Sequence, residues 1–282
     1  MYGAIIGDIV GSKYEFHNIK TRDFPLFSPG CDYTDDSIMT LAVGKALMLC
    51  PDAPHGKDWE ARLSQAMVAS MQDFGRRYPY PTGAYGSRFA QWLRQANPQP
   101  YNSFGNGSAM RVSSCGLAAK TLEDALALAR VSAAVSHNHP EGIKGAQAVA
   151  AAVFLARSGM KKDDIRTCLQ DNFYRLDFTL DEIRDSYGFD ESCQGSVPQA
   201  LEAFLESVSF EDAIRNVISL GGDCDTTGAI TGAVAWAYYA AQNGGPDEEM
   251  QSIRLQADAF LPTEFRQLAA EFDRFCQQRT GC

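Results

Sequence analysis

The sequence predicts an all-α protein whose 282 residues form one compact domain of many helices. Apolar residues recur every three or four positions along most of the chain, which is the spacing of one face of a helix. Almost no segment shows the alternation of polar and apolar residues that is typical of strands. Neither an internal repeat nor a Ser/Gly-rich linker divides residues 1–282, so the helices are expected to share a single core.

The composition is that of a soluble globular protein, with 45% hydrophobic and 21% charged residues. The net charge of −10 argues against a nucleic acid or an anionic membrane surface as partner, because both attract basic surfaces. The longest apolar segment, residues 228–241, is too short to span a bilayer and predicts a core helix. We expect a monomer that does not bind membranes.

Eight cysteines are scattered along the chain without a C-x-x-C pair. A chain of this length has no need of disulfides to hold its core, so reduced thiols are expected. The N-terminal residues also lack the charged and apolar regions of a secretory signal peptide. Both observations favour a cytoplasmic protein.

Residues 3–14 are predicted to form the first helix, because their large apolar side chains recur at helical spacing. A buried strand over residues 4–6 is the alternative for this segment. The segment also contains a stripe of small residues on which another helix could lie closely, formed by Gly3, Gly7 and Gly11.

Further helices are predicted by the same periodicity, and loops containing Pro, Gly and polar residues separate them. Their ranges are 35–49, 58–74, 88–95, 108–119, 121–135, 141–157, 161–170, 180–186, 197–207, 210–219, 228–242 and about 248–277. The loops include 16–33, 51–57, 75–87 and 171–195. Residues 136–142 are typical of a helix start, with Pro140 at the first helical position.

An acid-rich turn, Gly-Gly-Asp-Cys-Asp-Thr-Thr at residues 221–227, precedes the longest apolar segment. The two glycines allow a tight turn, and Asp225 or Thr226 could then cap the helix. Plain helix capping is the commonest explanation of such a cluster. However, several carboxylates at the edge of a core repel one another and resist desolvation unless a cation lies among them.

A second cluster, Tyr-Thr-Asp-Asp-Ser at residues 33–37, opens another predicted helix and makes the metal interpretation more specific. The candidate ligands of the two clusters are Thr34, Asp35, Asp36, Asp223, Asp225 and Thr226. Because all of them offer oxygen, Mg²⁺, Mn²⁺ or Ca²⁺ is favoured over Zn²⁺. Four carboxylates exceed what one Mg²⁺ usually takes from protein, so a site for two metal ions is predicted.

Residues 105–108, Gly-Asn-Gly-Ser, could offer backbone N–H groups to a phosphate at a helix start. A turn with a Ser cap explains the same residues equally well. His137 and His139 favour capping or hydrogen bonding to a ligand over zinc, because no further zinc ligands accompany them. The chain contains neither a dinucleotide fingerprint, nor a P-loop, nor a G-x-S-x-G nucleophile motif.

Four segments, in this order, resemble the motifs of the ADP-ribosylglycohydrolase family. They are residues 3–8 with Glu15 downstream, 34–37, 105–111 and 221–226, and a fifth match is Ser136-His137 followed by Pro140-Glu141. The resemblance covers nearly the whole chain. It implies an orthogonal all-α bundle with a binuclear Mg²⁺ or Mn²⁺ centre.

The resemblance also implies roles for individual residues. The two metals would be held by Thr34, Asp35, Asp36, Asp223, Asp225 and Thr226. Glu15 would be a movable carboxylate close to the site. The ADP-ribose cleft would be lined by Gly86, Asn106, Gly107, Ser108 and His137. The expected substrate is an ADP-ribosylated protein or a small ADP-ribosyl compound.

The expected reaction is hydrolysis of the bond at the ribose anomeric carbon, with arginine favoured as the leaving group. Such cleavage develops oxocarbenium character, and Asp35 or Glu15 is the candidate carboxylate for activating water. One alternative is a non-catalytic ADP-ribose-binding relative. Another is a different all-α two-metal enzyme such as an isoprenoid synthase, although the third acid of a D-D-x-x-D motif is missing after Asp36. The sequence does not distinguish arginine from serine or other leaving groups.

Overall fold

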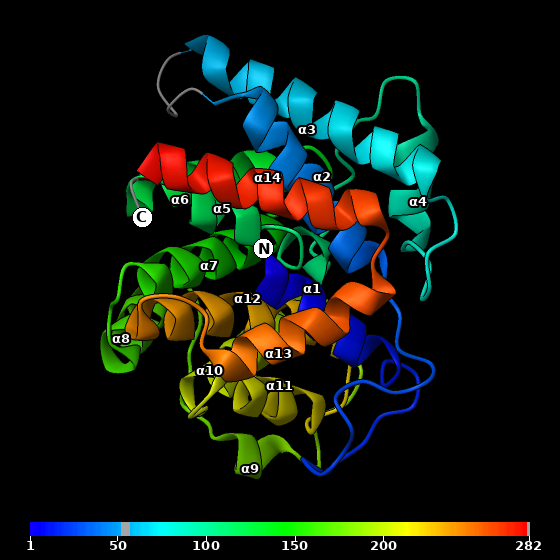
Figure 1. The fold of residues 1–282 in the computed structure, drawn as a ribbon. Coiled ribbons are helices and arrows are strands. Elements are labelled where there is room, and N and C mark those ends of the chain that lie inside the picture. The colour runs from blue at the N-terminus through cyan, green and yellow to red at the C-terminus, as the bar shows by residue number, and fades with distance from the viewer. Residues whose placement is uncertain (52–56, 281–282) are drawn as a thin grey trace.

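Fourteen α-helices and two short 3₁₀ helices are the regular elements of the computed structural model, which describes residues 1–51 and 57–280 (Figure 1). This part of the chain contains no β-strand, so the predicted all-α class is confirmed. In chain order the elements are α1 (Tyr2–Ser12), α2 (Asp35–Leu49), α3 (Lys57–Arg77), α4 (Ser87–Arg94), η1 (Asn106–Ser108), α5 (Ser113–Ala118), α6 (Leu122–Ala134), α7 (Pro140–Arg157), α8 (Lys162–Asn172), α9 (Leu180–Ile183), α10 (Cys193–Leu205), α11 (Phe210–Ile218), α12 (Cys224–Asn243), α13 (Glu248–Ala257), η2 (Asp258–Phe260) and α14 (Thr263–Thr280).

The helices α1 and α12 pack against each other, backbone to backbone, in the middle of the molecule (Figure 1). A Cβ added at Gly7 would lie 1.9 Å from the carbonyl oxygen of Gly228, and one added at Gly3 would lie 2.1 Å from that of Gly232. Only glycine fits at such an approach. Gly11 meets the backbone of Cys224 in the same way, so the helices run antiparallel. The small-residue stripe predicted from the sequence is therefore confirmed.

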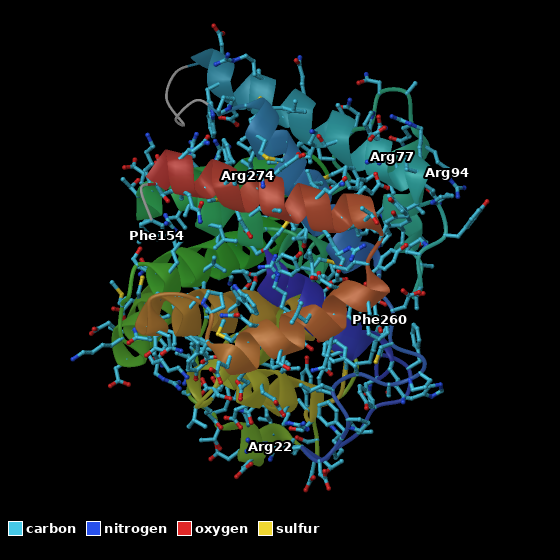
Figure 2. All side chains as sticks on the ribbon, in the orientation of Figure 1. Arg22, Arg77, Arg94, Phe154, Phe260 and Arg274 are labelled. Atoms are coloured by element: carbon cyan, nitrogen blue, oxygen red, sulfur yellow. The ribbon has the colours of Figure 1, made fainter. Side chains whose placement is uncertain are left out.

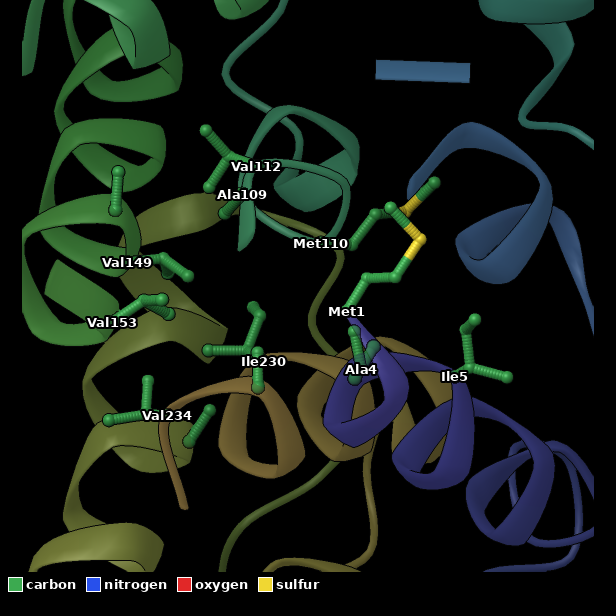
Figure 3. Packing of buried hydrophobic residues seen from close by; sticks show 14 of the residues in the cluster. Met1, Ala4, Ile5, Ala109, Met110, Val112, Val149, Val153, Ile230 and Val234 are labelled. Atoms are coloured by element: carbon green, nitrogen blue, oxygen red, sulfur yellow. The ribbon is translucent and has the colours of Figure 1, made fainter. Parts of the chain in front are cut away.

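Buried apolar side chains surround this pair and form one continuous core. Figure 3 shows Ile5 of α1 and Ile230 of α12 among them, together with Val149 of α7 and Met110 from the segment after η1. The helices α7, α10 and α11 all contact α12. The acid-rich turn before α12 thus lies at the edge of a packed core, and its position is fixed by several helices.

Several predicted boundaries are wrong. The first helix ends at Ser12 rather than residue 14, and the single helix expected at 108–119 is instead η1 followed by a break and α5. The C-terminal helix expected at about 248–277 is divided into α13, η2 and α14, and the break falls before Pro262, which has no N–H to donate. Helices α10 and α12 each begin four residues earlier than expected. Most of the predicted loop 51–57 lies outside the described residues.

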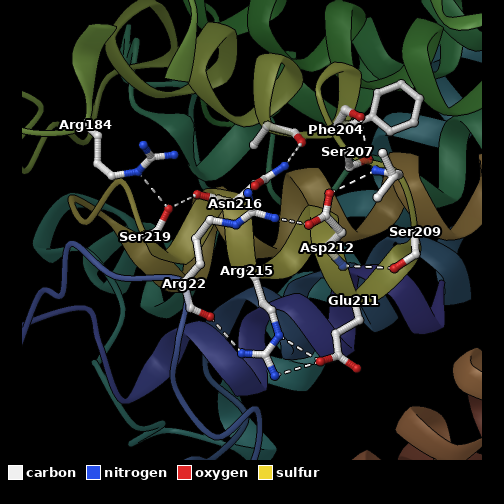
Figure 4. Close-up of polar contacts among 12 residues, drawn as sticks. Arg22, Arg184, Phe204, Ser207, Ser209, Glu211, Asp212, Arg215, Asn216 and Ser219 are labelled. Atoms are coloured by element: carbon white, nitrogen blue, oxygen red, sulfur yellow. Dashed lines mark hydrogen bonds and ion pairs between the residues drawn. The ribbon is translucent and has the colours of Figure 1, made fainter. Parts of the chain in front are cut away.

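The loop between α1 and α2 (residues 13–34) is fastened to α11 by charged side chains (Figure 4). Arg215 donates to the backbone carbonyls of Arg22 and Phe24, at 2.9 and 2.7 Å, and also binds Glu211. Arg22 forms an ion pair with Asp212 in the same region. These contacts hold the loop that carries Glu15.

Charged side chains project from the outside of the molecule, as Figure 2 shows for Arg22 and Arg94. Within the described residues, none of the helices combines the length and the apolar composition that crossing a membrane requires.

Candidate functional site

A cavity of about 340 Å³ opens where the N-termini of α2 and α12 face residues 83–111. One set of lining residues, which we call the acidic end, consists of Glu15, Asp35, Asp36, Asp223, Asp225 and Thr226. A second set, which we call the donor end, consists of Gly86, Arg88, Asn106, Gly107, Arg111 and His137, and the two sets meet where Asn106 binds Asp223. The two acidic motifs, which lie far apart in the sequence, therefore meet in one cavity with residues from the other motifs.

Asp8 ties α1 to the start of α2, although the sequence analysis gave this residue no role at the site. One carboxylate oxygen accepts hydrogen bonds from the backbone N–H groups of Thr34 and Ser37, both at 3.0 Å. The other accepts from the Thr34 hydroxyl at 2.7 Å. The available signal was a lone carboxylate in an otherwise apolar helix, fully buried here. Asp8 thus sets where Asp35 and Asp36 point.

The start of α2 presents a buried carboxylate to the cavity. Thr34 is the N-cap, and its side chain accepts from the N–H of Asp36 at 3.2 Å. One oxygen of Asp36 lies 3.3 Å from the hydroxyl of Thr226 at the start of α12. The other, Oδ1, is buried without a hydrogen-bond partner in the described part of the chain. A bare buried carboxylate oxygen is costly, so this atom fits a site that a cation completes.

The turn before α12 has the predicted geometry but a different cap. Gly221 and Gly222 take positive φ angles of 69° and 81°, as the two glycines predicted. The N-cap is Asp223, not Asp225 or Thr226, and its side chain makes no capping bond. Instead it accepts from the side-chain amide of Asn106 at 2.7 Å. Asp223 and Asp225 both remain directed to the cavity.

Two side chains of the α1–α2 loop hold this turn in place, and sequence reasoning missed both. The Asn18 side chain donates to the carbonyl of Gly222 at 2.9 Å and accepts from its N–H at 2.8 Å. The Lys20 ammonium donates to the carbonyl of Leu220 at 2.5 Å. Both residues lie in an irregular loop, where no periodic pattern marks them.

Glu15, Asp223 and Asp225 form the most compact acidic group in the described part of the chain. Each offers a carboxylate oxygen that lies within 4.8 Å of the others, which is close enough to share a metal ion. Glu15 lies beyond the end of α1, where the loop turns back toward α12. The sequence motifs predict a catalytic role for Glu15. The geometry makes Glu15 a candidate metal ligand as well.

The carboxylates of the acidic end destabilise one another's charge. Burial raises the pKa of Asp8 to about 7, and burial raises the pKa of Glu15 to about 8; in both cases the nearby charge of Asp225 adds to the effect. Burial, and after it the charge of Asp225, also raises the pKa of Asp35, Asp36 and Asp223 well above its usual value. A divalent cation would remove this mutual repulsion.

The donor end of the cavity is organised by Arg111, the last residue of the motif at residues 105–111. Its side chain is fully buried, and Nη2 donates to the Ser132 carbonyl at 2.9 Å and to the Ser136 hydroxyl at 2.8 Å. Its other side-chain nitrogens have no hydrogen-bond partner among the described residues, and the guanidinium lies 5.4 Å from the ring centre of Phe89.

This arrangement places a hydroxyl hydrogen within reach of His137. Because arginine can only donate, the Ser136 oxygen accepts from Arg111, and its own hydrogen is available to Nδ1 of His137, 2.8 Å away. When Ser136 donates to Nδ1, the ring hydrogen lies on Nε2, the atom nearest to Gly107. Burial lowers the pKa of His137 well below its usual value, and the charges of Arg111 and Arg88 lower it further. His137 is thus a neutral donor at the cavity.

Comparison with known proteins identifies the family. Residues 1–279 match the sequence model of the ADP-ribosylglycohydrolase family. The chain belongs to this family. Its members hydrolyse ADP-ribose linkages, so the predicted enzyme class is confirmed, and the acidic group of the cavity is a candidate metal site for such a hydrolase.

Individual ADP-ribosylglycohydrolases resemble the chain over most of its length. The ADP-ribosylhydrolase ARH3 of Homo sapiens is 26% identical, in an alignment of 352 positions that covers 98% of this chain and 92% of that protein. The ADP-ribosylarginine hydrolase Tri1 of Pseudomonas putida (strain GB-1) is 25% identical, covering 90% of this chain and 72% of its own. A solved structure, an ADP-ribosylglycohydrolase-related protein complex, has the same fold with a TM-score of 0.62 and 22% identity, over 92% of this chain and 95% of its own.

The ADP-ribosylglycohydrolase cavity contains four of the five residues predicted to bind substrate. Gly86, Asn106, Gly107 and His137 line it. The fifth, Ser108, is not among the lining residues, because its buried hydroxyl donates to the carbonyl of Gly142 at 2.7 Å. Its side chain therefore joins η1 to α7, a role that tertiary packing decides.

Proposed function

We propose that this ADP-ribosylglycohydrolase cleaves the glycosidic bond between ADP-ribose and a modified arginine side chain, with the help of two divalent cations, Mg²⁺ or Mn²⁺. The observation that carries the proposal is that a single cavity is lined both by carboxylates and by hydrogen-bond donors. An anionic diphosphate suits the donor end, and cations together with a cationic leaving group suit the acidic end.

The ions would be held by oxygen ligands from the two helix starts. The proposed ligands are Thr34, Asp35, Asp36, Asp223, Asp225 and Thr226. The bare Oδ1 atom of Asp36 and the mutual repulsion of its neighbours support this set. When bound, the cations would fix the ribose hydroxyls and lower the pKa of water at the anomeric carbon.

The side chains have separate tasks in this proposal. Glu15 or Asp35 accepts the proton of the attacking water at a carboxylate oxygen, since both line the acidic end. Asn106, which already binds Asp223, keeps that carboxylate turned to the cavity. His137 donates from Nε2 to an oxygen of the ADP-ribose. Gly86 leaves room for the substrate, because no atom of the described residues lies within 4 Å of a Cβ added there.

Two observations support arginine as the modified residue. One relative of the chain bears the name ADP-ribosylarginine hydrolase. In addition, a guanidinium leaving group is positively charged beside the carboxylates of the cavity, whereas a serine hydroxyl is neutral. We place the enzyme in the cytoplasm, because six cysteines of the described residues (31, 115, 168, 193, 224 and 276) are free thiols, as expected in a reducing compartment.

The test is release of ADP-ribose from two defined peptides, one ADP-ribosylated on arginine and one on serine. The purified protein with Mg²⁺ should release ADP-ribose from the arginine peptide, and EDTA should stop the release. Manganese should restore activity after EDTA treatment and removal of the chelator. Binding of both peptides without any release, with either metal, would contradict hydrolysis and favour a binding module.

A further inference from the structure

Two exposed phenylalanines stand at the acidic end of the cavity. Phe16 is 67% exposed and Phe189 is 48% exposed, yet both line the cavity. They come from loops far apart in the sequence, and their rings stack with centres 6.4 Å apart and planes inclined by 23°. Neither belongs to the hydrophobic core. Apolar side chains left in water beside a cavity are typical of a surface that a ligand covers.

Both loops are held in place before any ligand binds. The Lys20 ammonium links them, because it donates to the carbonyl of Tyr187 at 2.7 Å. The carbonyl of Glu191 accepts from the N–H of Asn106 at 2.7 Å, and the hydroxyl of Tyr187 donates to the carbonyl of Gly195 at 3.0 Å. The phenylalanine pair is therefore presented by a fixed frame.

Carboxylates accompany both rings. Glu15 directly precedes Phe16, and Glu191 follows Phe189 by two residues; both acids line the same cavity. The two carboxylates are close enough for Glu191 to contribute to the raised pKa of Glu15, after burial, Asp225 and Asp8. Aromatic faces together with carboxylates attract a cation, and a planar guanidinium can stack on a ring while it donates to a carboxylate.

The cavity also has a direction. Arg88, Arg111 and His137 are the lining residues that suit phosphate. Phe16, by contrast, directly follows Glu15 of the compact acidic group, and its ring stacks on that of Phe189. A substrate whose diphosphate lies at the donor end has its ribose at the acidic end. Whatever is attached to that ribose then reaches the two rings.

We propose that Phe16, Phe189 and Glu191 form the leaving-group subsite of this enzyme and select the guanidinium of arginine over a neutral hydroxyl. This inference rests on the proposed function and adds the residues that determine specificity. Because the subsite touches the departing side chain only, it should leave the affinity for ADP-ribose itself unchanged.

The experiment compares kcat/KM for peptides ADP-ribosylated on arginine and on serine. In the double variant Phe16→Ser/Phe189→Ser, the value for the arginine peptide should fall about tenfold relative to that for the serine peptide. Glu191→Gln should lower the same ratio about threefold. The matched control Leu255→Ser removes a 71% exposed side chain from α13, outside the cavity, and should leave the ratio unchanged. Calorimetry should give the same Kd for free ADP-ribose in all four proteins.

Equal losses on both peptides, or a weakened affinity for ADP-ribose, would overturn the subsite. A second measurement separates its failure from that of the proposed function. Saturation-transfer NMR on N-acetylarginine amide, with the protein loaded with ADP-ribose and Mg²⁺, should show contact of the guanidinium with the wild type but not with the double variant. If the wild type cleaves neither peptide and this contact is present, the hydrolysis is refuted and the subsite stands; if the wild type cleaves the arginine peptide and the contact is absent, the subsite alone is refuted.

Discussion

The two ends of the cavity are stabilised in opposite ways. At the donor end, hydrogen bonds join the Arg111 cation to the neutral Ser136 and His137, and Nε and Nη1 of Arg111 have no partner in the described residues. At the acidic end, carboxylates from two helix starts and a loop face one another, and Oδ1 of Asp36 has no partner in the described residues.

The difference lies in the charges, because the donor end joins a cation to neutral groups, whereas the acidic end gathers charges of one sign. Buried hydrogen bonds between neutral or oppositely charged groups stabilise a folded chain, whereas adjacent carboxylates destabilise it until a cation binds. Substitutions at the donor end should therefore weaken the affinity for the substrate and disturb its orientation. The acidic end should respond by losing catalysis while the metal-free protein becomes more stable.

The largest effect is expected from removing acids. Substituting Asp35, Asp36, Asp223 or Asp225 singly with Ala should each lower Mg²⁺-dependent release of ADP-ribose by more than about a thousandfold, because a ligand loss costs more than the roughly 10–100-fold of an outer-shell change. Initial rates on the arginine peptide measure this. Glu271→Gln, an exposed carboxylate of α14, is the control and should keep full activity. Undiminished turnover in all four variants would refute the acidic centre.

The contact that brings the acidic motifs together can also be broken. Gly7→Ala should lower the free energy of unfolding by more than about 3 kcal/mol, because the new Cβ would collide with the backbone of Gly228. Urea denaturation measures the change. Gly188→Ala is the matched control, since no atom lies within 4 Å of a Cβ added there. Equal stability of the two variants would contradict the backbone contact of α1 and α12.

Metal binding should stabilise the fold through the acidic end. Magnesium at a hundredfold excess over its Kd should raise the free energy of unfolding by about 2.7 kcal/mol and Tm by roughly 5–10 °C. Asp36→Asn should have a higher Tm than the wild type in EDTA, because one buried charge is gone, and a smaller gain on adding magnesium. Thermal scans of both proteins decide this; equal gains would argue against Asp36 as a ligand.

The donor end should show its own pH dependence of stability. Burial, Arg111 and Arg88 keep the pKa of His137 low, so the unfolded chain binds a proton that the folded chain does not. The stability contributed by the neutral ring is present above about pH 6.5 and is lost toward lower pH, by up to about 1.4 kcal/mol per pH unit.

Chemical denaturation in EDTA between pH 7.5 and pH 5 measures this dependence. His137→Gln should lack the decline, and the acidic end, which is present in both proteins, cancels in the comparison. A wild type that is destabilised by acid no more than His137→Gln would contradict the neutral, buried state of the ring.

The smallest effect is expected from the hydroxyl between Arg111 and His137. Ser136→Ala removes the group that places the hydrogen on Nε2 and should raise KM about fivefold with little change in kcat. Nitrogen-15 NMR should show a mixture of His137 tautomers in place of one. Ser132→Ala is the matched control, because its buried hydroxyl has no hydrogen-bond partner in the described part of the chain. A single unchanged tautomer in Ser136→Ala would contradict the role of the Ser136 hydroxyl in placing the hydrogen on His137.

Local sequence signals predicted much of the fold. The periodicity of apolar residues predicted most of the helices. The stripe formed by Gly3, Gly7 and Gly11 predicted the surface on which α12 packs. The boundaries near residues 108–119 and 258–263 were wrong, because apolar spacing continues through both breaks. The second break falls before Pro262, which has no N–H to donate, and periodicity carries no information on such a break.

The candidate site could be predicted only where its residues form a local pattern in the sequence. Paired acids at two helix starts are visible in the sequence, and the structure brings Asp35 and Asp36 to the same cavity as Asp223 and Asp225. Ser108 shows the limit, since a hydroxyl at a helix start can face a ligand or a neighbouring helix. No pattern of residues marks Asn18 or Lys20, whose partners are backbone atoms about two hundred residues away.

By itself, the sequence determined that this chain is helical, that it carries two oxygen-rich acidic motifs, and that its first helix can be approached closely. Only the tertiary structure decided that the two motifs share a cavity, that Asp8 and Asn18 hold them in position, and that Phe16 and Phe189 stand beside them. The physical reason is the range of the forces involved. Helix formation is set by neighbours within about four residues, whereas a cluster of like charges requires the packing energy of a whole core to hold it together.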